Sequence, residues 1–146
     1  MKMVLGRALM VQTDVVLDRE SKLPAAAFPP DMTESINLRN WLIKVGSTKK
    51  GVKLNLFKTN VVRSAIRQLF ALKEHLPGPI WVHADIVPGP NYKFHPFPAV
   101  DPKEFINEFN SGRSFGMTLS VGWASHYSLE RANQENSYVV NYSTVQ

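Results

Sequence analysis

Four short apolar segments, separated by stretches with helical periodicity, constrain the fold of this chain most strongly. They are rich in β-branched residues, are bounded by turn residues, and cover residues 11–17, 52–57, 80–87 and 117–124. Such runs are typical of strands that are buried on both faces of a parallel sheet. Because a parallel pair needs a crossover connection, the sequence predicts strands that alternate with helices.

Two helices are expected between the first three strands. Thr33 is a candidate N-cap for the first helix, which would bury Ile36 with other apolar residues and end at a left-handed Gly46. The second helix is expected over residues 60–75, with Phe70 on an apolar face spaced at i, i+3 and i+4. Both connect one predicted strand to the next.

The third helix has the clearest start signal in the chain. Asp101 is an expected N-cap, and Pro102 suits the first helical turn, where its missing N–H costs nothing. Glu104 completes an acidic version of the capping box. The polar stretch 126–146 shows no comparable pattern, so we expect a domain over residues 1–125 and a poorly ordered tail after it.

Alternating strands and helices predict an α/β fold, either a doubly wound sheet or a barrel. The chain lacks a glycine-rich phosphate loop, which favours the barrel. A complete barrel of this kind takes about 250 residues, whereas this chain has 146. The expectation is therefore a partial (β/α) TIM-type barrel of parallel strands, without the first strand and the last strands.

Composition narrows the classes of partner and site. The chain has 17 basic and 12 acidic residues, a net charge of +5, and no cysteine, which excludes disulfides and thiolate metal sites. The basic segment 39–73 contains no acid and lacks the aromatic interleaving of a nucleic-acid platform, so nucleic acid is not an expected partner. No apolar window is long enough for a membrane span, and Arg7 interrupts any signal peptide.

Polar residues fall in pairs within three of the predicted strands. Residues two apart on a strand face the same side, so each pair shares one face. Two interpretations remain open: the pairs line a polar ligand cavity, or they form a structural network in which Lys53 pairs with an aspartate and His83 is a core histidine. With Asn91 from the turn after the third strand, the candidate ligand residues are Gln12, Asp14, Lys53, Asn55, His83, Asp85 and Asn91.

Several motifs resemble those of the menorin family. Residues 83–91, HADIVPGPN, resemble its Asn-Ala-Asp-Ile-Leu-Pro-Gly-Pro-Asn signature, and 118–123, TLSVGW, its Thr-Leu-Ser-Leu-Gly-Trp. Residues 50–55, KGVKLN, are similar to Lys-Gly-Ile-Lys-Leu-Asp, and 12–15, QTDV, to Glu-Ala-Asp-Val. Residues 27–30, AFPP, correspond to Ala-His-Pro-Pro. The resemblance implies a barrel similar to phospholipase-C-like and glycerophosphodiester phosphodiesterase domains.

The chain departs from the family pattern at the positions that the resemblance links to catalysis. Enzymes of that superfamily use histidines for acid–base chemistry and a divalent cation held by carboxylates. Gln12 replaces a glutamate, Asn55 an aspartate, and Phe28 a histidine, while His83 replaces an asparagine. Fewer carboxylates lower the affinity for Mg²⁺ or Ca²⁺, and a phenylalanine has no proton to transfer.

The resemblance therefore implies a menorin-like domain without catalysis, a pseudoenzyme that acts as an extracellular interaction module and needs no cofactor. The alternative is a metal-dependent hydrolase of a small phosphodiester or lysophospholipid. Asp14 and Asp85 would then hold Mg²⁺ or Ca²⁺, His83 would donate a proton, and Lys53 would contact the phosphate.

Localisation and assembly are further expectations. The resemblance implies an extracellular protein with a protein partner, and Asn141 lies in an N-glycosylation sequon. A partial barrel exposes unpaired strand edges, which promote association. The chain is thus expected to be a fragment or short isoform whose stable state requires a partner.

Overall fold

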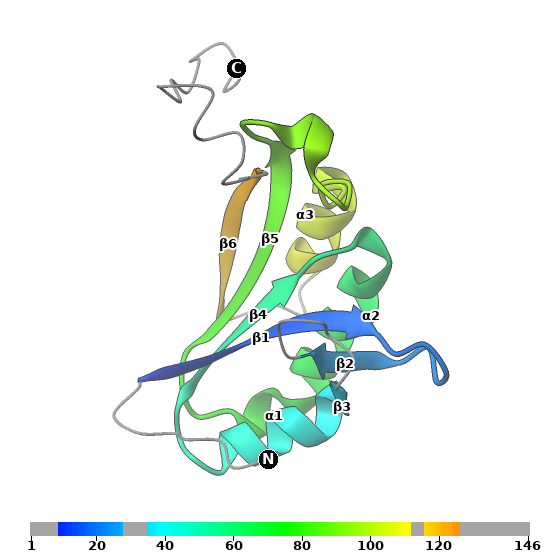
Figure 1. Ribbon diagram of the computed structural model, residues 1–146. Coiled ribbons are helices and arrows are strands. Elements are labelled where there is room, and N and C mark those ends of the chain that lie inside the picture. The colour runs from blue at the N-terminus through cyan, green and yellow to red at the C-terminus, as the bar shows by residue number, and fades with distance from the viewer. Residues whose placement is uncertain (1–8, 28–34, 112–115, 126–146) are drawn as a thin grey trace.

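The computed structural model describes residues 9–27, 35–111 and 116–125, which form a mixed α/β fold (Figure 1). The strands are β1 (Met10–Leu17), β2 (Pro24–Ala27), β3 (Ser35–Asn37), β4 (Gly51–Leu56), β5 (Ile80–Pro88) and β6 (Met117–Ala124). The helices are α1 (Leu38–Gly46), α2 (Thr59–Leu72) and α3 (Pro102–Asn110), with 3₁₀ turns at Lys73–His75 and Tyr92–Phe94.

The strands form a mostly parallel sheet in the order β3-β2-β1-β4-β5-β6. β1, β4, β5 and β6 are parallel to one another, which confirms the predicted alternation of strands and helices. β2 is antiparallel to both β1 and β3. Over the described residues the sheet is open, and closure into a TIM-type barrel stays a prediction.

Sequence patterns did not identify β2 and β3. β2 has the sequence Pro-Ala-Ala-Ala, and alanine and proline have low strand propensity. All four residues are nevertheless buried, since β2 lies between β1 and β3. Tertiary packing therefore sets the conformation of this segment against its local preference.

All three helices pack on one face of the sheet (Figure 1). The core lies between the helices and the sheet. It includes Val52 and Leu54 of β4, Trp41 of α1 and Ile66 of α2, all at most 1% exposed. The prediction that the strands are buried on both faces was wrong. The opposite face of the four parallel strands carries polar side chains, and these are half-buried or exposed because no described helix covers that side.

The start and end of α1 differ from the prediction. Asn37 is the N-cap and accepts a hydrogen bond from the Arg39 N–H at 2.9 Å, whereas Thr33 lies outside the described residues. Ile36 belongs to β3 rather than to the helix. Gly46 is not left-handed, because the first positive φ after α1 occurs at Lys49. The absent side chain of Gly46 instead leaves room for the carbonyl of His75.

The other two helices follow their sequence signals closely. α2 matches the predicted segment, except that its last turn is a 3₁₀ turn and Phe70 is 47% exposed instead of buried. Asp101 is the N-cap of α3 as predicted, and its carboxylate accepts a hydrogen bond from the Glu104 N–H at 2.8 Å. Phe105 of α3 is fully buried.

The edge strand β6 exposes an apolar surface. Leu119, Val121 and Trp123 are 38%, 53% and 56% exposed. Leu119 and Val121 stand in register with the buried Val82 and Ala84 of β5, so they point to the helix side of the sheet. We call these three side chains the β6 surface. Among the described residues, no helix has the length and apolar character that a membrane crossing requires.

Candidate functional site

One row of polar residues crosses the face of the sheet opposite the helices. Asp14 of β1 is in register with Asn55 of β4, Asn55 with His83 of β5, and His83 with Ser120 of β6. Residues in register on parallel strands project from the same side, so the four polar side chains are neighbours. The predicted polar pairs therefore do share one face.

The first half of this row is linked by a direct hydrogen bond. The amide nitrogen Nδ2 of Asn55 donates to Oδ1 of Asp14 at 2.9 Å. The carbonyl oxygen Oδ1 of Asn55 is buried and has no hydrogen-bond partner among the described residues. An aspartate at position 55 would place a second carboxylate here, whereas asparagine satisfies the existing one as a donor.

The second half of the row is centred on His83. Its Nδ1 lies 2.8 Å from the hydroxyl oxygen of Ser120, and its Nε2 lies 3.2 Å from Oδ1 of Asp85. An ionised carboxylate only accepts, so in the neutral form of the ring the Nε2–H donates to Asp85 and Nδ1 accepts from the Ser120 hydroxyl. Both ring nitrogens of His83 thus have a protein partner.

Gly122 of β6 makes this arrangement sterically possible. A Cβ at that position would collide with Oδ1 of Asp85 and lie 3.1 Å from Cε1 of His83. Gly122 is also the register partner of Asp85. The bare backbone of Gly122 therefore lets the His83–Asp85 pair lie across the adjacent strand.

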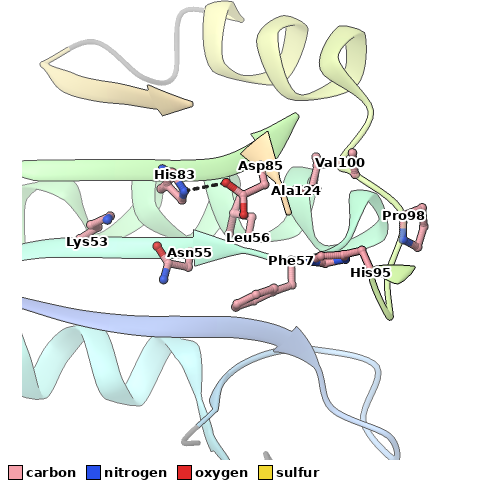
Figure 2. Close-up of a pocket in the computed structure, with 11 residues that line it drawn as sticks. Lys53, Asn55, Leu56, Phe57, His83, Asp85, His95, Pro98, Val100 and Ala124 are labelled. Atoms are coloured by element: carbon pink, nitrogen blue, oxygen red, sulfur yellow. Dashed lines mark hydrogen bonds and ion pairs between the residues drawn. The ribbon is translucent and has the colours of Figure 1, made fainter. Parts of the chain in front are cut away.

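A cavity of about 110 Å³ lies at the carboxyl ends of β4, β5 and β6. Figure 2 shows His83 and Asp85 on β5 beside Lys53 and Asn55 on β4. His95 lies on the loop that forms the far wall. The cavity thus combines one lysine, two imidazoles, an amide and a carboxylate, a set that suits a small polar ligand with an anionic group.

The loop that carries His95 is held by hydrogen bonds to the sheet and to itself. Backbone N–H groups of Gly89 and Val100 donate to the carbonyls of Ala124 and Asp85, at 3.0 and 2.9 Å. The Ala99 N–H donates to the hydroxyl of Tyr92 at 2.8 Å. These bonds fix both ends of the loop against the carboxyl ends of β5 and β6.

The predicted ligand residues separate into three groups. Lys53, Asn55, His83 and Asp85 line the cavity, and Asp14 adjoins it through Asn55. Gln12 is exposed in register with Lys53 and does not line the cavity. Asn91 has a left-handed φ of 55° and caps the Tyr92–Phe94 turn, so it shapes the loop. Phe28 and Asn141 fall outside the described residues.

The ion pairs of the structural-network interpretation are only partly present. Within the described residues, Lys53 forms no ion pair with Asp14 or Asp85, whereas His83 does contact Asp85. The same residues contain no group of three or more His, Asp or Glu side chains that could hold a metal ion. The two carboxylates that remain, Asp14 and Asp85, lie in different halves of the row.

Sequence patterns did not identify three residues of the site, Ser120, Gly122 and His95. Ser120 and Gly122 belong to a predicted strand, and strand pairing would have placed Ser120 beside His83 had the register been known. His95 reaches the cavity through loop geometry, for which no sequence pattern exists. The aromatic residues around it, Tyr92 and Phe97, have ring centroids 6.3 and 6.5 Å from the imidazole.

Comparisons with known proteins agree with the motifs. The family model of the Menorin N-terminal domain matches residues 2–143. The chain is 32% identical to Protein FAM151B of Homo sapiens over 136 aligned residues. This alignment covers 91% of this chain and 48% of FAM151B. The chain therefore spans about half the length of this curated relative. No solved structure gives a significant match. The chain belongs to the menorin family.

Proposed function

We propose that this chain is a non-catalytic menorin-family domain that serves as an extracellular interaction module. The observation that carries the proposal is the hydrogen bond from Asn55 to Asp14. A divalent cation needs oxygen ligands with enough negative charge. Here the Asn55 amide donates to an oxygen of Asp14 and Gln12 supplies no charge, so the described residues form no carboxylate cluster of the kind that metal-dependent chemistry requires.

His83 supports the same proposal. A general acid must reach the leaving group of the substrate with its proton. The Nε2–H of His83 donates to Asp85, while Nδ1 accepts from Ser120. Donation to a phosphodiester would therefore break an existing hydrogen bond. Because both ring nitrogens already have partners on β5 and β6, this imidazole has no free N–H to donate to a phosphodiester.

The β6 surface supports the interaction role. Contiguous apolar side chains at a sheet edge are typical of protein–protein contact sites. The parallel strands β1, β4, β5 and β6 are also neighbours in the order in which they follow one another along the chain. This order is typical of a barrel segment, so we infer that the fold is part of a TIM-type barrel and that a protein partner covers β6.

Hydrolysis of a chromogenic phosphodiester with Mg²⁺, Mn²⁺ and Ca²⁺ in turn tests the proposal. We expect no metal-dependent turnover by the wild-type chain. The double variant Gln12→Glu/Asn55→Asp restores the family carboxylates and should bind the cations, which shows what the native residues have lost. Wild-type turnover that requires metal and disappears in Asp85→Asn would overturn the proposal.

The alternative, a metal-dependent phosphodiester hydrolase, has one specific observation in its favour. Lys53, His83, Asp85 and His95 line one cavity. Lysine and imidazole groups can bind a phosphate. The sequence alone offered His83 as the proton donor, and His95 would add a second imidazole. Under this alternative, Lys53→Met should lower turnover while leaving the fold intact, and the assay above decides between the two functions.

Extracellular localisation is part of the proposal and rests on the resemblance to menorin. Material recovered from culture medium after expression of the full-length protein in animal cells would be digested and mapped by mass spectrometry. We expect a glycan on Asn141. Recovery of the protein only from cell lysate, with Asn141 unmodified, would contradict this part of the proposal.

A further inference from the structure

Ser120, His83 and Asp85 form a nucleophile–base–carboxylate arrangement on the open face of the sheet. We propose that Ser120 is a reactive serine that takes up the acyl group of small activated carboxylic esters. The inference goes beyond the proposed function, which concerns metal-dependent phosphodiester chemistry, whereas acyl uptake by Ser120 needs no metal and uses the same Ser120–His83 hydrogen bond.

The geometry meets the distance requirements for an activated serine. Ser120 Oγ lies 2.8 Å from Nδ1 of His83, within the range expected between a nucleophile and its general base. The second ring nitrogen lies 3.2 Å from the carboxylate of Asp85, which orients the imidazole and stabilises its protonated form. Gly122 leaves space for that carboxylate, because any side chain there would displace it.

The reaction balances without metal or cofactor. Ser120 Oγ forms a bond to the carbonyl carbon of the ester, and its proton passes to Nδ1 of His83. The bond from carbon to the leaving oxygen then breaks, and that oxygen takes the proton from Nδ1. The products are acyl-Ser120 and the free alcohol, with His83 neutral again.

The site is accessible to a small reagent. Ser120 is half-buried, and the side chains of His83 and Asp85 are 22% and 40% exposed. The three residues lie on the sheet face that no described helix covers, next to the cavity of about 110 Å³ that His83 and Asp85 line. This space favours acyl groups of acetyl size over long chains.

The first test uses the full chain with a fluorophosphonate, a reagent selective for activated serines, followed by intact mass and peptide mapping. We expect a single adduct at Ser120, and at least ~100-fold slower labelling in Ser120→Ala and His83→Asn, the usual range for loss of a general base. Ser47→Ala is the matched control. Its exposed hydroxyl donates to the Lys44 carbonyl at 2.8 Å, away from any imidazole, so labelling should stay at the wild-type rate.

A second test uses the absence of native cysteine and does not depend on Ser120→Ala folding. Ser120→Cys and Ser47→Cys each carry one thiol, and their alkylation rates with iodoacetamide can be compared directly. Ser120→Cys should react at least ~10-fold faster, because His83 favours the thiolate, and adding His83→Asn should remove the advantage. Equal rates for the two thiols, or fluorophosphonate labelling at another residue, would overturn the proposal.

Discussion

Replacing Asn55 by aspartate should destabilise the chain by about 2–5 kcal/mol in the absence of divalent metal. The substitution removes the 2.9 Å hydrogen bond to the Asp14 carboxylate, and a hydrogen bond to a charged group contributes roughly 1.5–3 kcal/mol. It also places two carboxylates side by side. Their repulsion at about 4 Å is about 4 kcal/mol at an effective dielectric constant near 20, and partial exposure reduces this figure.

Urea denaturation followed by circular dichroism measures the effect. Asn107→Asp is the control, because it makes the same chemical change at an exposed position of α3 and should shift the free energy of unfolding by less than about 0.5 kcal/mol. A divalent cation at about 100 times its Kd should restore about 2.7 kcal/mol to Asn55→Asp. An Asn55→Asp variant as stable as wild type without metal would refute the reasoning.

Further predictions concern the contact of Gly122 with Asp85, the turn between β1 and β2, and the β6 surface. Gly122→Ala should separate Asp85 from His83, which nuclear magnetic resonance would detect as a change in the imidazole nitrogen shifts; an unchanged spectrum would contradict the steric argument. The Ser21 backbone N–H and hydroxyl lower the pKa of Asp18 below 3.8, so Asp18 stabilises the fold above that pH and loses its contribution as the pH falls through the lowered value. The difference in thermal midpoint between wild type and Asp18→Asn should therefore narrow in acid, and a pH-independent difference would argue against it. The chain should bind a hydrophobic dye and elute from a sizing column as an associated species, because the β6 surface is exposed. Trp123→Lys should lower the dye fluorescence. Sharp elution as a monomer without dye binding would count against an interaction role for the β6 surface.

Local signals predicted most of the elements because they act within a few residues. The apolar runs identified β1, β4, β5 and β6 to within one residue at each end, since β-branched residues in a short buried run have few alternatives. Asp101 with Pro102 fixed the start of α3 for the same local reason. β2 was missed because only its burial between β1 and β3 keeps its alanines extended, and β3 is three residues long, too short for a periodic pattern.

Contacts between residues that are distant in sequence explain the features that local patterns did not predict. Gly46 and Gly122 are glycines because of neighbours distant in sequence, the His75 carbonyl and the Asp85 carboxylate, rather than because of backbone conformation. The polar pairs indicated a shared face correctly, but the partner of each side chain depends on strand register. His95 enters the cavity through a loop whose path follows from hydrogen bonds to β5 and β6, and no local pattern encodes such a path.

A calorimetric titration of the wild-type chain with Mg²⁺, Ca²⁺ and Mn²⁺ shows whether the polar row holds a divalent cation, because it measures metal binding itself and needs no substrate. Asp14 accepts a hydrogen bond from Asn55, and Asp85 contacts His83 in the other half of the row, so the two carboxylates do not meet. We therefore expect no saturable binding at millimolar cation, and saturable binding once Gln12→Glu and Asn55→Asp are combined. Saturable binding by the wild-type chain that Asp85→Asn abolishes would mean that the native residues do form a metal site and that the domain is not a pseudoenzyme for lack of one.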